Sequence, residues 1–453
     1  MSTSITKGAL LILALALGFS ASAQQKTLDN YIQQAFSSNK GLKDQNIQLD
    51  QALYALKEAK SLFGPDVTFL GSYVKSGGGR VIDIPVGDML NPAYSTLNQL
   101  TGTHNFPTME NMKFQLNPDN FLDTKVRTSM PLVNAEIYYN QQIKKEQLSR
   151  QQAAVNVYKR QLVQDVKTAY YRYYQAVQAV AIYKSADALI NENIRINESM
   201  VRNGVRNNTA LYRSKTEKEK NEASINQAEN SRDNARAYFN FLLNRPLTDN
   251  IEIDSSTIDL PATNIASDDV SQREELQEYK HAIGAYQYNN KLQRSYLIPK
   301  LNTFLDLGSQ GSPLTFNSST RYYFFGVNME WNLFSFHKNK YKIKQSETAL
   351  SSVNMAASQT EDQLKLQLFQ AKNDYISAVK NFNTARTQLD FAERYYRDQL
   401  KVYKEGQLLY LELVDAQNQL TQARLQTAVT QANVQSTIAA VERAQAGYPL
   451  ENK

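Results

Sequence analysis

The chain has 453 residues, of which 42% are hydrophobic, and it carries no cysteine and a formal net charge of +6. This length and apolar content suffice for two or three ordinary domains. A charge so small over such a length argues against a nucleic-acid partner. Without cysteine, the chain can form no disulfide and carry no lipid-modified cysteine after a leader.

Residues 1–23 have the pattern of a signal peptide. A lone lysine precedes an apolar core from Ala9 to Phe19, and residues 21–23 read Ala-Ser-Ala, a small-x-small cleavage site. We therefore predict an exported chain without a lipid anchor. Beyond the leader no run of about 18 apolar residues occurs, so we expect that only β-strands could carry the chain across a bilayer.

The mature chain contains two copies of one unit, over residues 24–243 and 271–453, joined by a Pro/Asp/Ser-rich connector over 244–270. Three matched pairs keep their order: Pro65 with Pro299, Leu132 with Leu333, and Gly204 with Gly406. The separation falls between the first pair and the second. This drop places a longer loop in the first copy.

Each copy predicts a helix, two strands and a helical hairpin. A proline ends the first helix and opens a strand, because it cannot continue a helix but suits the first residue of a strand. We expect strands at about 66–75 and 123–133 in the first copy, and at about 299–308 and 321–334 in the second. The outer loop over 76–120 is rich in Gly, Pro and Asn, and we expect it to belong to neither strand nor hairpin.

The predicted strands alternate apolar and polar residues. Charged side chains occupy one face, as at Lys125, Arg127 and Glu330, and must be wet. The other face carries the residues that we expect to meet lipid: Val126, Met130, Val327, Met329 and Trp331. A soluble sheet would alternate in the same way, so the pattern alone leaves the solvent open. Four strands cannot close a barrel, so a barrel would have to be shared by several chains.

The long helices have a coiled-coil pattern. In the last one, large residues stand seven apart, and small residues follow three behind each of them: Leu413, Leu420, Thr427, Val434 and Val441, then Ala416, Ala423, Thr430, Thr437 and Ala444. Residues 134–202 contain no Pro or Gly, with apolar residues on a three-four spacing. Gly204 and Gly406 then interrupt the pattern, which predicts the tips of two helical hairpins.

In this arrangement the chain resembles the TolC-type outer-membrane efflux family, from about Leu28 to Gly447. The resemblance rests on the duplicated unit, the Ser-x-x-x-Pro strand entries at Ser61 and Ser295, "NRPL" closing the first copy, and "VYKEGQLLYLELVDAQNQLTQA" in the second. It implies a mainly helical fold whose hairpins form an α-barrel, with four strands per chain contributed to a shared twelve-stranded β-barrel. It also implies a homotrimer in outer-membrane lipid that docks to a periplasmic adaptor and an inner-membrane transporter.

The resemblance assigns Glu412, Asp415 and Tyr403 to the periplasmic entrance of such a channel. Glu412 and Asp415 share one helix face. The alternative interpretation is that they are carboxylates at a helix N-terminus, stabilised there by the helix dipole. The alternative for Tyr403 is a seam residue at heptad spacing with Leu400. The chain departs from the family at Leu408, where a gating arginine can occur, and at Ala210, where an acidic partner can occur.

By the same resemblance, the hairpin tips would dock the adaptor: Gly204, Val205 and Thr209 in the first copy, and Gly406, Leu409 and Leu411 in the second. The alternative is plain turn chemistry.

The sequence offers no sign of catalysis, metal binding or a cofactor. The triple glycine at 77–79 is not followed by Lys-Ser/Thr or a helix start, and the three histidines have no ligand-spaced partners. We therefore expect a passive exit duct of a tripartite efflux or type I secretion system, opened by its adaptor and pump. The main alternative is an exported coiled-coil structural or adaptor-like protein without a pore, and a secreted glycosidase is the second. The cargo is not encoded in these patterns.

Overall fold

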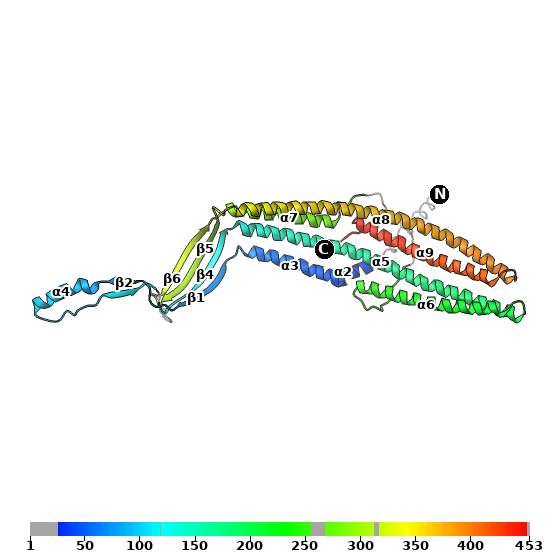
Figure 1. Cartoon of the computed structure of the whole chain (residues 1–453), viewed down its shortest axis with the longest axis horizontal. Helices are drawn as coiled ribbons and strands as arrows, with labels where there is room; N and C mark the ends of the chain where they lie inside the picture. Colours follow the sequence, from blue (N-terminus) through cyan, green and yellow to red (C-terminus); the bar gives the residue numbers. More distant parts are fainter. Residues whose placement is uncertain (1–25, 118, 255–267, 312–316, 451–453) are drawn as a thin grey trace, which may run out of the picture. The chain divides into compact units, whose positions relative to one another are not determined.

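The computed structural model describes residues 26–117, 119–254, 268–311 and 317–450 (Figure 1). The predicted signal peptide over residues 1–23 lies outside these ranges, as does the middle of the predicted connector over 244–270. Among the described helices, none combines the length and the apolar character that crossing a membrane requires.

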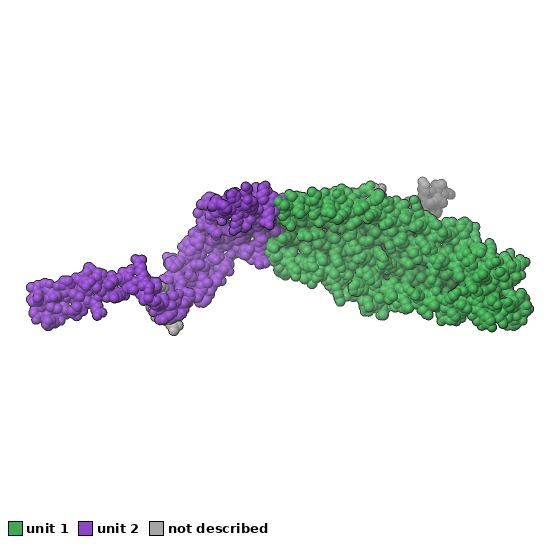
Figure 2. Space-filling model, viewed as in Figure 1, with its two compact units in different colours: residues 1–55, 144–287, 348–453 green, residues 56–143, 288–347 purple. Residues whose placement is uncertain are grey.

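The chain divides into two compact units, which are coloured separately in Figure 2. The helical unit comprises residues 1–55, 144–287 and 348–453, and the strand unit comprises residues 56–143 and 288–347. The helices that build or enter the helical unit are α2 (Lys26–Ser38), α3 (Lys40–Ser61), α5 (Ala135–Arg202), α6 (Asn208–Leu242), α7 (Glu274–Arg294), α8 (Lys338–Lys404) and α9 (Tyr410–Ala444).

Helices α5 and α6 form one hairpin, and α8 and α9 form a second (Figure 1). The first hairpin pairs helices of 68 and 35 residues, and the second pairs helices of 67 and 35 residues. Contacts tie the two arms together, as where Asn221 of α6 donates to the Tyr183 carbonyl of α5 at 3.1 Å. Such closely matched lengths are what an internal duplication predicts.

Most of the predicted heptad seam of α9 is buried, while Ala423, Thr427 and Thr437 are half-buried. Leu413, Val434 and Val441 are fully buried. On α5 the predicted apolar stripe is also buried, with Val166 at its centre. A buried leucine or valine contributes roughly 1.5–3 kcal/mol, so these seams hold the hairpins closed.

The largest core lies where α2, α5 and α6 meet. Its buried aromatic residues include Tyr170 of α5 and Phe239 of α6. The hydroxyls of Tyr31 and Tyr170 accept hydrogen bonds from the backbone N–H groups of Glu252 and Asp254, at 3.0 and 2.9 Å. The start of the predicted connector is thereby tied to the core.

The strand unit contains a four-stranded antiparallel sheet in the order β1-β4-β5-β6. Its strands are β1 (Asp66–Val74), β4 (Phe121–Val133), β5 (Lys300–Gly311) and β6 (Arg321–Glu330). The 3-10 turn Ser295–Leu297 precedes β5. The prediction of a mainly helical chain with four antiparallel strands is confirmed by the helices above and by this sheet.

Strand β6 is shorter than predicted. It ends at Glu330, which pairs with Lys300, the first residue of β5. The residue that would face Trp331 is Pro299, which precedes β5, so no residue of β5 remains to pair with Trp331. The expectation that Trp331 lies within the strand is therefore wrong.

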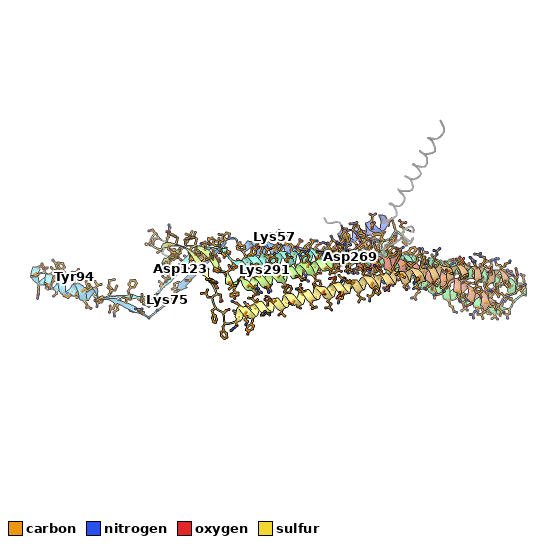
Figure 3. The ribbon with its side chains drawn as sticks, turned by 90° about the horizontal axis from the view of Figure 1, so that it is seen from above. Lys57, Lys75, Tyr94, Asp123, Asp269 and Lys291 are labelled. Atoms are coloured by element: carbon orange, nitrogen blue, oxygen red, sulfur yellow. The ribbon has the colours of Figure 1, made fainter. Side chains whose placement is uncertain are left out.

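The segment over 76–120 is also different from the expectation. It contains β2 (Val81–Ile84), α4 (Val86–Thr101) and β3 (Met112–Gln115), and β2 pairs with β3. Figure 3 labels Tyr94 on α4. Pro92 lies within this helix. The many Gly, Pro and Asn residues suggested a loop, but asparagines such as Asn91 and Asn98 form hydrogen bonds within the segment. The predicted outer loop therefore contains a helix and two short strands of its own, although it belongs neither to the four-stranded sheet nor to the two hairpins.

Candidate functional site: the hairpin tips and the four-stranded sheet

The predicted site residues lie in two regions, one in each unit. The first is the pair of hairpin tips in the helical unit, and the second is the four-stranded sheet in the strand unit.

Each hairpin tip turns at a glycine with a left-handed backbone. Gly204 has a φ of 72° and Gly406 has a φ of 80°. The N–H of Val205 donates to the Met200 carbonyl at 2.9 Å, and that of Gln407 donates to the Val402 carbonyl at 3.3 Å. These are helix-ending bonds, and a side chain at either glycine would strain the backbone. The two tips are therefore built alike.

Tyr403 is fully buried between the two hairpins of one chain. Its hydroxyl donates to the Oδ1 atom of Asn197 on α5, and its ring lies 5.7 Å from that of Tyr410 on α9. Burial raises the pKa of Tyr403 and of Tyr410 above the ordinary tyrosine value. Both phenols stay neutral at physiological pH.

A small hydrophobic core surrounds Tyr403 and joins α5, α8 and α9 just above the tips. Its buried members are Ile196, Tyr396, Tyr403, Tyr410, Leu413, Val414, Ala416 and Leu420. A buried amide pair accompanies it, because Asn193 of α5 donates to Gln417 Oε1 of α9 at 2.7 Å. Buried amide pairs fix relative position, since each partner left alone would cost about 1–3 kcal/mol.

Arg206 links the two tips of one chain. Its guanidinium lies 4.9 Å from the centre of the Tyr403 ring. The same group donates to the carbonyl oxygens of Leu408 and Gly406 in the other tip. Sequence reasoning noted that position 408 lacks an arginine, but it missed that an arginine from the first hairpin reaches the backbone at that position.

Glu412 and Asp415 are both exposed on the first turns of α9. Asp415 accepts a hydrogen bond from Gln419 Nε2 at 2.6 Å. Leu409, the N-cap of α9, provides no side-chain cap, so a carboxylate near this helix start has a favourable dipole interaction. The two carboxylates are three residues apart on α9, so they share one face of the helix.

The apolar tip residues are exposed. Val205, Leu409 and Leu411 keep 62%, 65% and 57% of their surface. Thr209 is the second residue of α6, and its N–H donates to the Asn207 side chain at 3.1 Å. Turn chemistry accounts for Asn207 and for the glycines, but not for the exposed apolar side chains.

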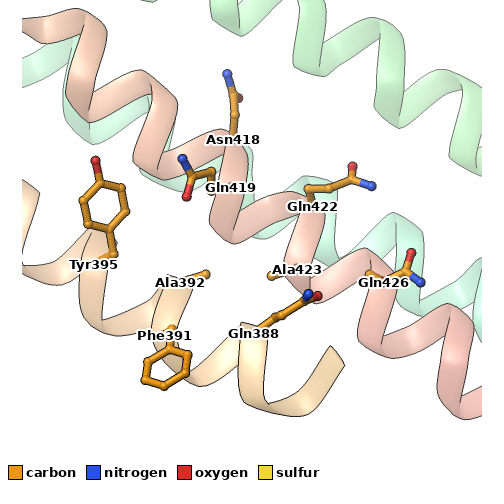
Figure 4. A pocket seen from close by; sticks show the side chains of 9 residues that line it. All are labelled: Gln388, Phe391, Ala392, Tyr395, Asn418, Gln419, Gln422, Ala423 and Gln426. Atoms are coloured by element: carbon orange, nitrogen blue, oxygen red, sulfur yellow. The ribbon is translucent and has the colours of Figure 1, made fainter. Parts of the chain in front are cut away.

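A groove runs between α8 and α9 above the second tip, with a volume of about 770 Å³. Figure 4 shows Phe391 and Tyr395 on the α8 side and the amides of Gln419, Gln422 and Gln426 on the α9 side. Phe391 is 62% exposed in the single chain.

The register of the sheet sorts its residues onto two faces. Val126 lies between Phe69 and Leu307, and Leu307 lies beside Tyr323. The neighbouring row runs from Val67 through Thr128 and Leu305 to Phe325, and the next from Met130 through Thr303 to Val327. Met329 follows on the same face, paired with Leu301. Four of the five predicted apolar residues, all except Trp331, therefore share one face of the sheet.

This apolar face is uncovered in the single chain. Phe69, Tyr323 and Phe325 are each 70% or more exposed. Exposed apolar patches of this kind are rare on monomeric soluble proteins and mark contact with another protein or a membrane.

The opposite face is polar and internally paired. Arg127 of β4 donates to both carboxylate oxygens of Asp306 on β5, at 2.7 Å each. Lys125 lies 3.7 Å from Asp123 and 3.8 Å from Asp306. The Tyr322 hydroxyl of β6 donates to Asp123 at 2.7 Å. Charged side chains of β4 and β5, together with the Tyr322 hydroxyl of β6, thus form one network on this face.

Residues 267–447 match the model of the outer membrane efflux protein family. No curated protein matches the chain. The resemblance to TolC-type outer-membrane efflux proteins, predicted from the duplicated unit, is confirmed by this match together with the solved structures described next.

Solved structures of outer-membrane channels share the fold of the whole chain. The chain is similar to CmeC of Campylobacter jejuni, with a TM-score of 0.75 and 14% identity over 93% of this chain and 86% of that one. It is also similar to CusC, with a TM-score of 0.75 and 16% identity over 92% of each chain. The open-state MtrE channel of Neisseria gonorrhoeae is similar with a TM-score of 0.73 and 16% identity, over 93% of this chain and 89% of that one.

CmeC, to which the chain is similar, is an outer-membrane channel. The described residues hold no cluster of three or more His, Asp or Glu side chains that could bind a metal ion. His281 forms a pair with Glu146, with 2.8 Å between Nδ1 and Oε2. This pair joins α7 to α5 within the helical unit.

Proposed function

We propose that the chain is the outer-membrane exit duct of a tripartite efflux or type I secretion system. In this proposal three copies form the working assembly, which is exported by the signal peptide over residues 1–23 and embedded in the outer membrane. The duct is passive and makes or breaks no bond. A periplasmic adaptor and an inner-membrane transporter open it and supply energy.

The uncovered apolar face of the sheet is the observation that carries this proposal. Three copies of the order β1-β4-β5-β6 would supply twelve strands. Strands β1 and β6 are the edges of this sheet within one chain, and exposed edges invite pairing with another chain. Closure of β6 of one copy on β1 of the next would leave no edge, which is a requirement inside a bilayer.

The two faces of the sheet fit two different solvents. Val126, Met130, Val327 and Met329 would contact lipid, while the network around Arg127 and Asp306 would line water. Tyr323 lies near the start of β6 on the apolar face, as aromatic residues do at membrane interfaces. Trp331, beyond the strand, is exposed and suits the opposite interface as a lipid contact.

The helical hairpins would form the periplasmic part of the duct. Threefold symmetry would gather Glu412 and Asp415 of three copies into one ring at the entrance. A ring of carboxylates favours cations over anions. Tyr403 would act there by fixing the two hairpins of each copy to one another, through its contacts with Asn197 and Arg206.

The exposed tips would receive the adaptor. Val205, Leu409 and Leu411 offer apolar contact area on turns that Gly204 and Gly406 make possible, and Thr209 is the second residue of the helix beside them. Exposed apolar side chains on a rigid turn suit a protein partner, because they lose little conformational freedom on binding.

Single-channel recording tests this proposal. The full chain is purified in detergent and added to a planar lipid bilayer. We expect stepwise conductance that falls when trivalent cations are added on the side of the tips. A protein that disperses in buffer without detergent and gives no conductance would support the non-channel alternative instead.

A further inference from the structure

The segment over residues 76–120 has a folded structure of its own, which the proposed duct function does not explain. Helix α4 (Val86–Thr101) packs against the return segment that precedes β3. Asn91 donates to the Met109 carbonyl at 2.9 Å and accepts from its N–H at 2.8 Å. Asn98, seven residues later, makes the same two bonds with Phe106, at 2.8 and 3.1 Å.

These paired amide bonds fix the return segment along one face of the helix. Each asparagine side chain bonds to the backbone of the return segment through one donor and one acceptor, as a neighbouring β-strand would. Asp88 and Asn111 add a third link, because the Asn111 side chain donates to Asp88 Oδ2 at 2.9 Å. The segment therefore presents its remaining side chains in a defined arrangement.

A shallow pocket of about 450 Å³ lies between α4 and the return segment. This volume is within the range of roughly 300–1,000 Å³ that small-molecule sites occupy. Two aromatic rings contribute to its lining, Tyr94 and Phe106, with ring centres 5.6 Å apart. Figure 3 shows where Tyr94 lies on α4.

The polar groups of the pocket fall into two classes. Asn91 and Asn98 are used by the fold. Thr103 is also used by the fold, because its hydroxyl lies 2.8 Å from that of Thr101. The others are Ser95, Gln99, His104 and Thr108, and within the described part of the chain these four side chains make no hydrogen bond. The pocket thus offers hydroxyl, amide and imidazole groups, which both donate and accept, around two rings.

The charge of the pocket restricts its ligand. Residues 89–109 contain no Asp, Glu, Lys or Arg, so no carboxylate, ammonium or guanidinium group lines the pocket to pair with a charged ligand. A purely apolar ligand would bury the free amide and hydroxyl groups without partners, at about 1–3 kcal/mol each. The pocket therefore suits a neutral molecule that carries both hydroxyl groups and an apolar face.

We propose that this pocket binds a neutral saccharide. The C–H face of a pyranose ring would lie on Tyr94 or Phe106, and its hydroxyl groups would bond with Gln99, Ser95 and His104. Two sources share this chemistry, a free oligosaccharide and a polysaccharide chain of a cell surface. The inference does not depend on the duct.

Binding to the full chain in detergent tests this inference. The probes are neutral trisaccharides of glucose, mannose and N-acetylglucosamine, an acidic trisaccharide, and purified surface polysaccharide from the producing cells. We expect at least one neutral probe to bind, measured by calorimetry, and Gln99→Ala to weaken binding at least tenfold. Tyr94→Phe keeps the ring and should retain binding, whereas Tyr94→Ala should lose it.

Met89→Ala is the matched control, since Met89 is exposed on the same helix and does not line the pocket. Limited proteolysis verifies that each variant keeps the segment folded, and Gln99, itself exposed, can be changed without loss of a recorded contact. Binding of the trisaccharides alone or of the polysaccharide alone supports the inference and identifies the source. The inference is overturned if no neutral probe binds, if only the acidic probe binds, or if Gln99→Ala binds like the wild type. Conductance should be the same in all these variants, so failure here leaves the duct untouched.

Discussion

The hairpin tips and the four-stranded sheet differ in how far a single chain completes them. At the tips, Tyr403 and Leu413 are fully buried by the chain's own helices. In the sheet, Phe325 and Tyr323 stay at least 70% exposed, and both edge strands are open. The helical unit thus carries its own core, whereas the strand unit needs another surface. In the proposed duct, lipid and further copies of the chain would supply that surface.

Removal of a seam leucine should have the largest effect on the helical unit. Leu413→Ala leaves a cavity between α8 and α9, and we expect it to cost about 2–5 kcal/mol. The control is Leu411→Ala, two residues away and exposed, which should change stability by less than about 0.5 kcal/mol. Thermal melting followed by circular dichroism measures both. Equal effects of the two substitutions would mean that the tip core is not what holds the hairpins.

A charge on the apolar face should damage the sheet by a comparable amount. Val327→Arg would place a cation in lipid, at a cost of about 2–4 kcal/mol near the middle of the bilayer. Asn328→Arg places the same side chain on the opposite face and should be tolerated. Heat-dependent gel mobility of the assembled protein reports the difference. If Asn328→Arg proves the more damaging, the two faces have been assigned the wrong way round.

Loss of the link between the tips should have a moderate effect. Arg206→Ala removes the bonds to the Leu408 and Gly406 carbonyls, and hydrogen bonds of charged groups contribute about 1.5–3 kcal/mol when buried. Because Arg206 is only partly buried, we expect about 1 kcal/mol.

Hydrogen exchange of residues 403–409 should become faster in Arg206→Ala, while Arg202→Ala, at the exposed end of α5, serves as the control. Unchanged exchange would show that Tyr403 and Asn197 suffice to hold the two tips together.

Alkaline pH should weaken the tips, because burial raises the pKa of Tyr403 and Tyr410. A raised pKa in the folded chain gives stability that is complete below the unfolded value of about 10 and is lost as the pH rises above it. The loss is at most about 1.4 kcal/mol per pH unit for each group. Melting of the wild type and of Tyr410→Phe between pH 9 and pH 11 isolates the contribution of Tyr410. A variant that loses stability as steeply as the wild type would contradict this.

The smallest effect on stability should come from the exposed carboxylates. Replacing Glu412 and Asp415 by Ala should leave melting nearly unchanged but weaken block by multivalent cations. Single-channel recording with cations on the side of the tips measures this, with Glu405→Ala as an exposed control in the turn beside them. Block that persists in the double variant would leave only the helix-dipole interpretation.

The sequence predicted those features that repeat along the chain. The heptad of α9 identified Leu413, Val434 and Val441, and two-residue alternation identified the shared face of Val126 and Val327. Such patterns are visible because each residue repeats the environment of another. They also carried the family resemblance.

Features set by single tertiary contacts were not visible. Arg206 looks like an ordinary turn residue until the other hairpin tip lies beside it. Asn91 and Asn98 suggest a loop by composition, although they hold α4 against its return segment. The end of β6 before Trp331 follows from the start of its partner strand β5 at Lys300.

The mass of the detergent-solubilised assembly, measured by native mass spectrometry, tests the central claim most directly. If lipid and neighbouring copies complete the sheet, the particle should contain three chains and should require detergent to remain dispersed. A single chain that stays dispersed in plain buffer would contradict the account, because its apolar face and open strand edges would then have no partner.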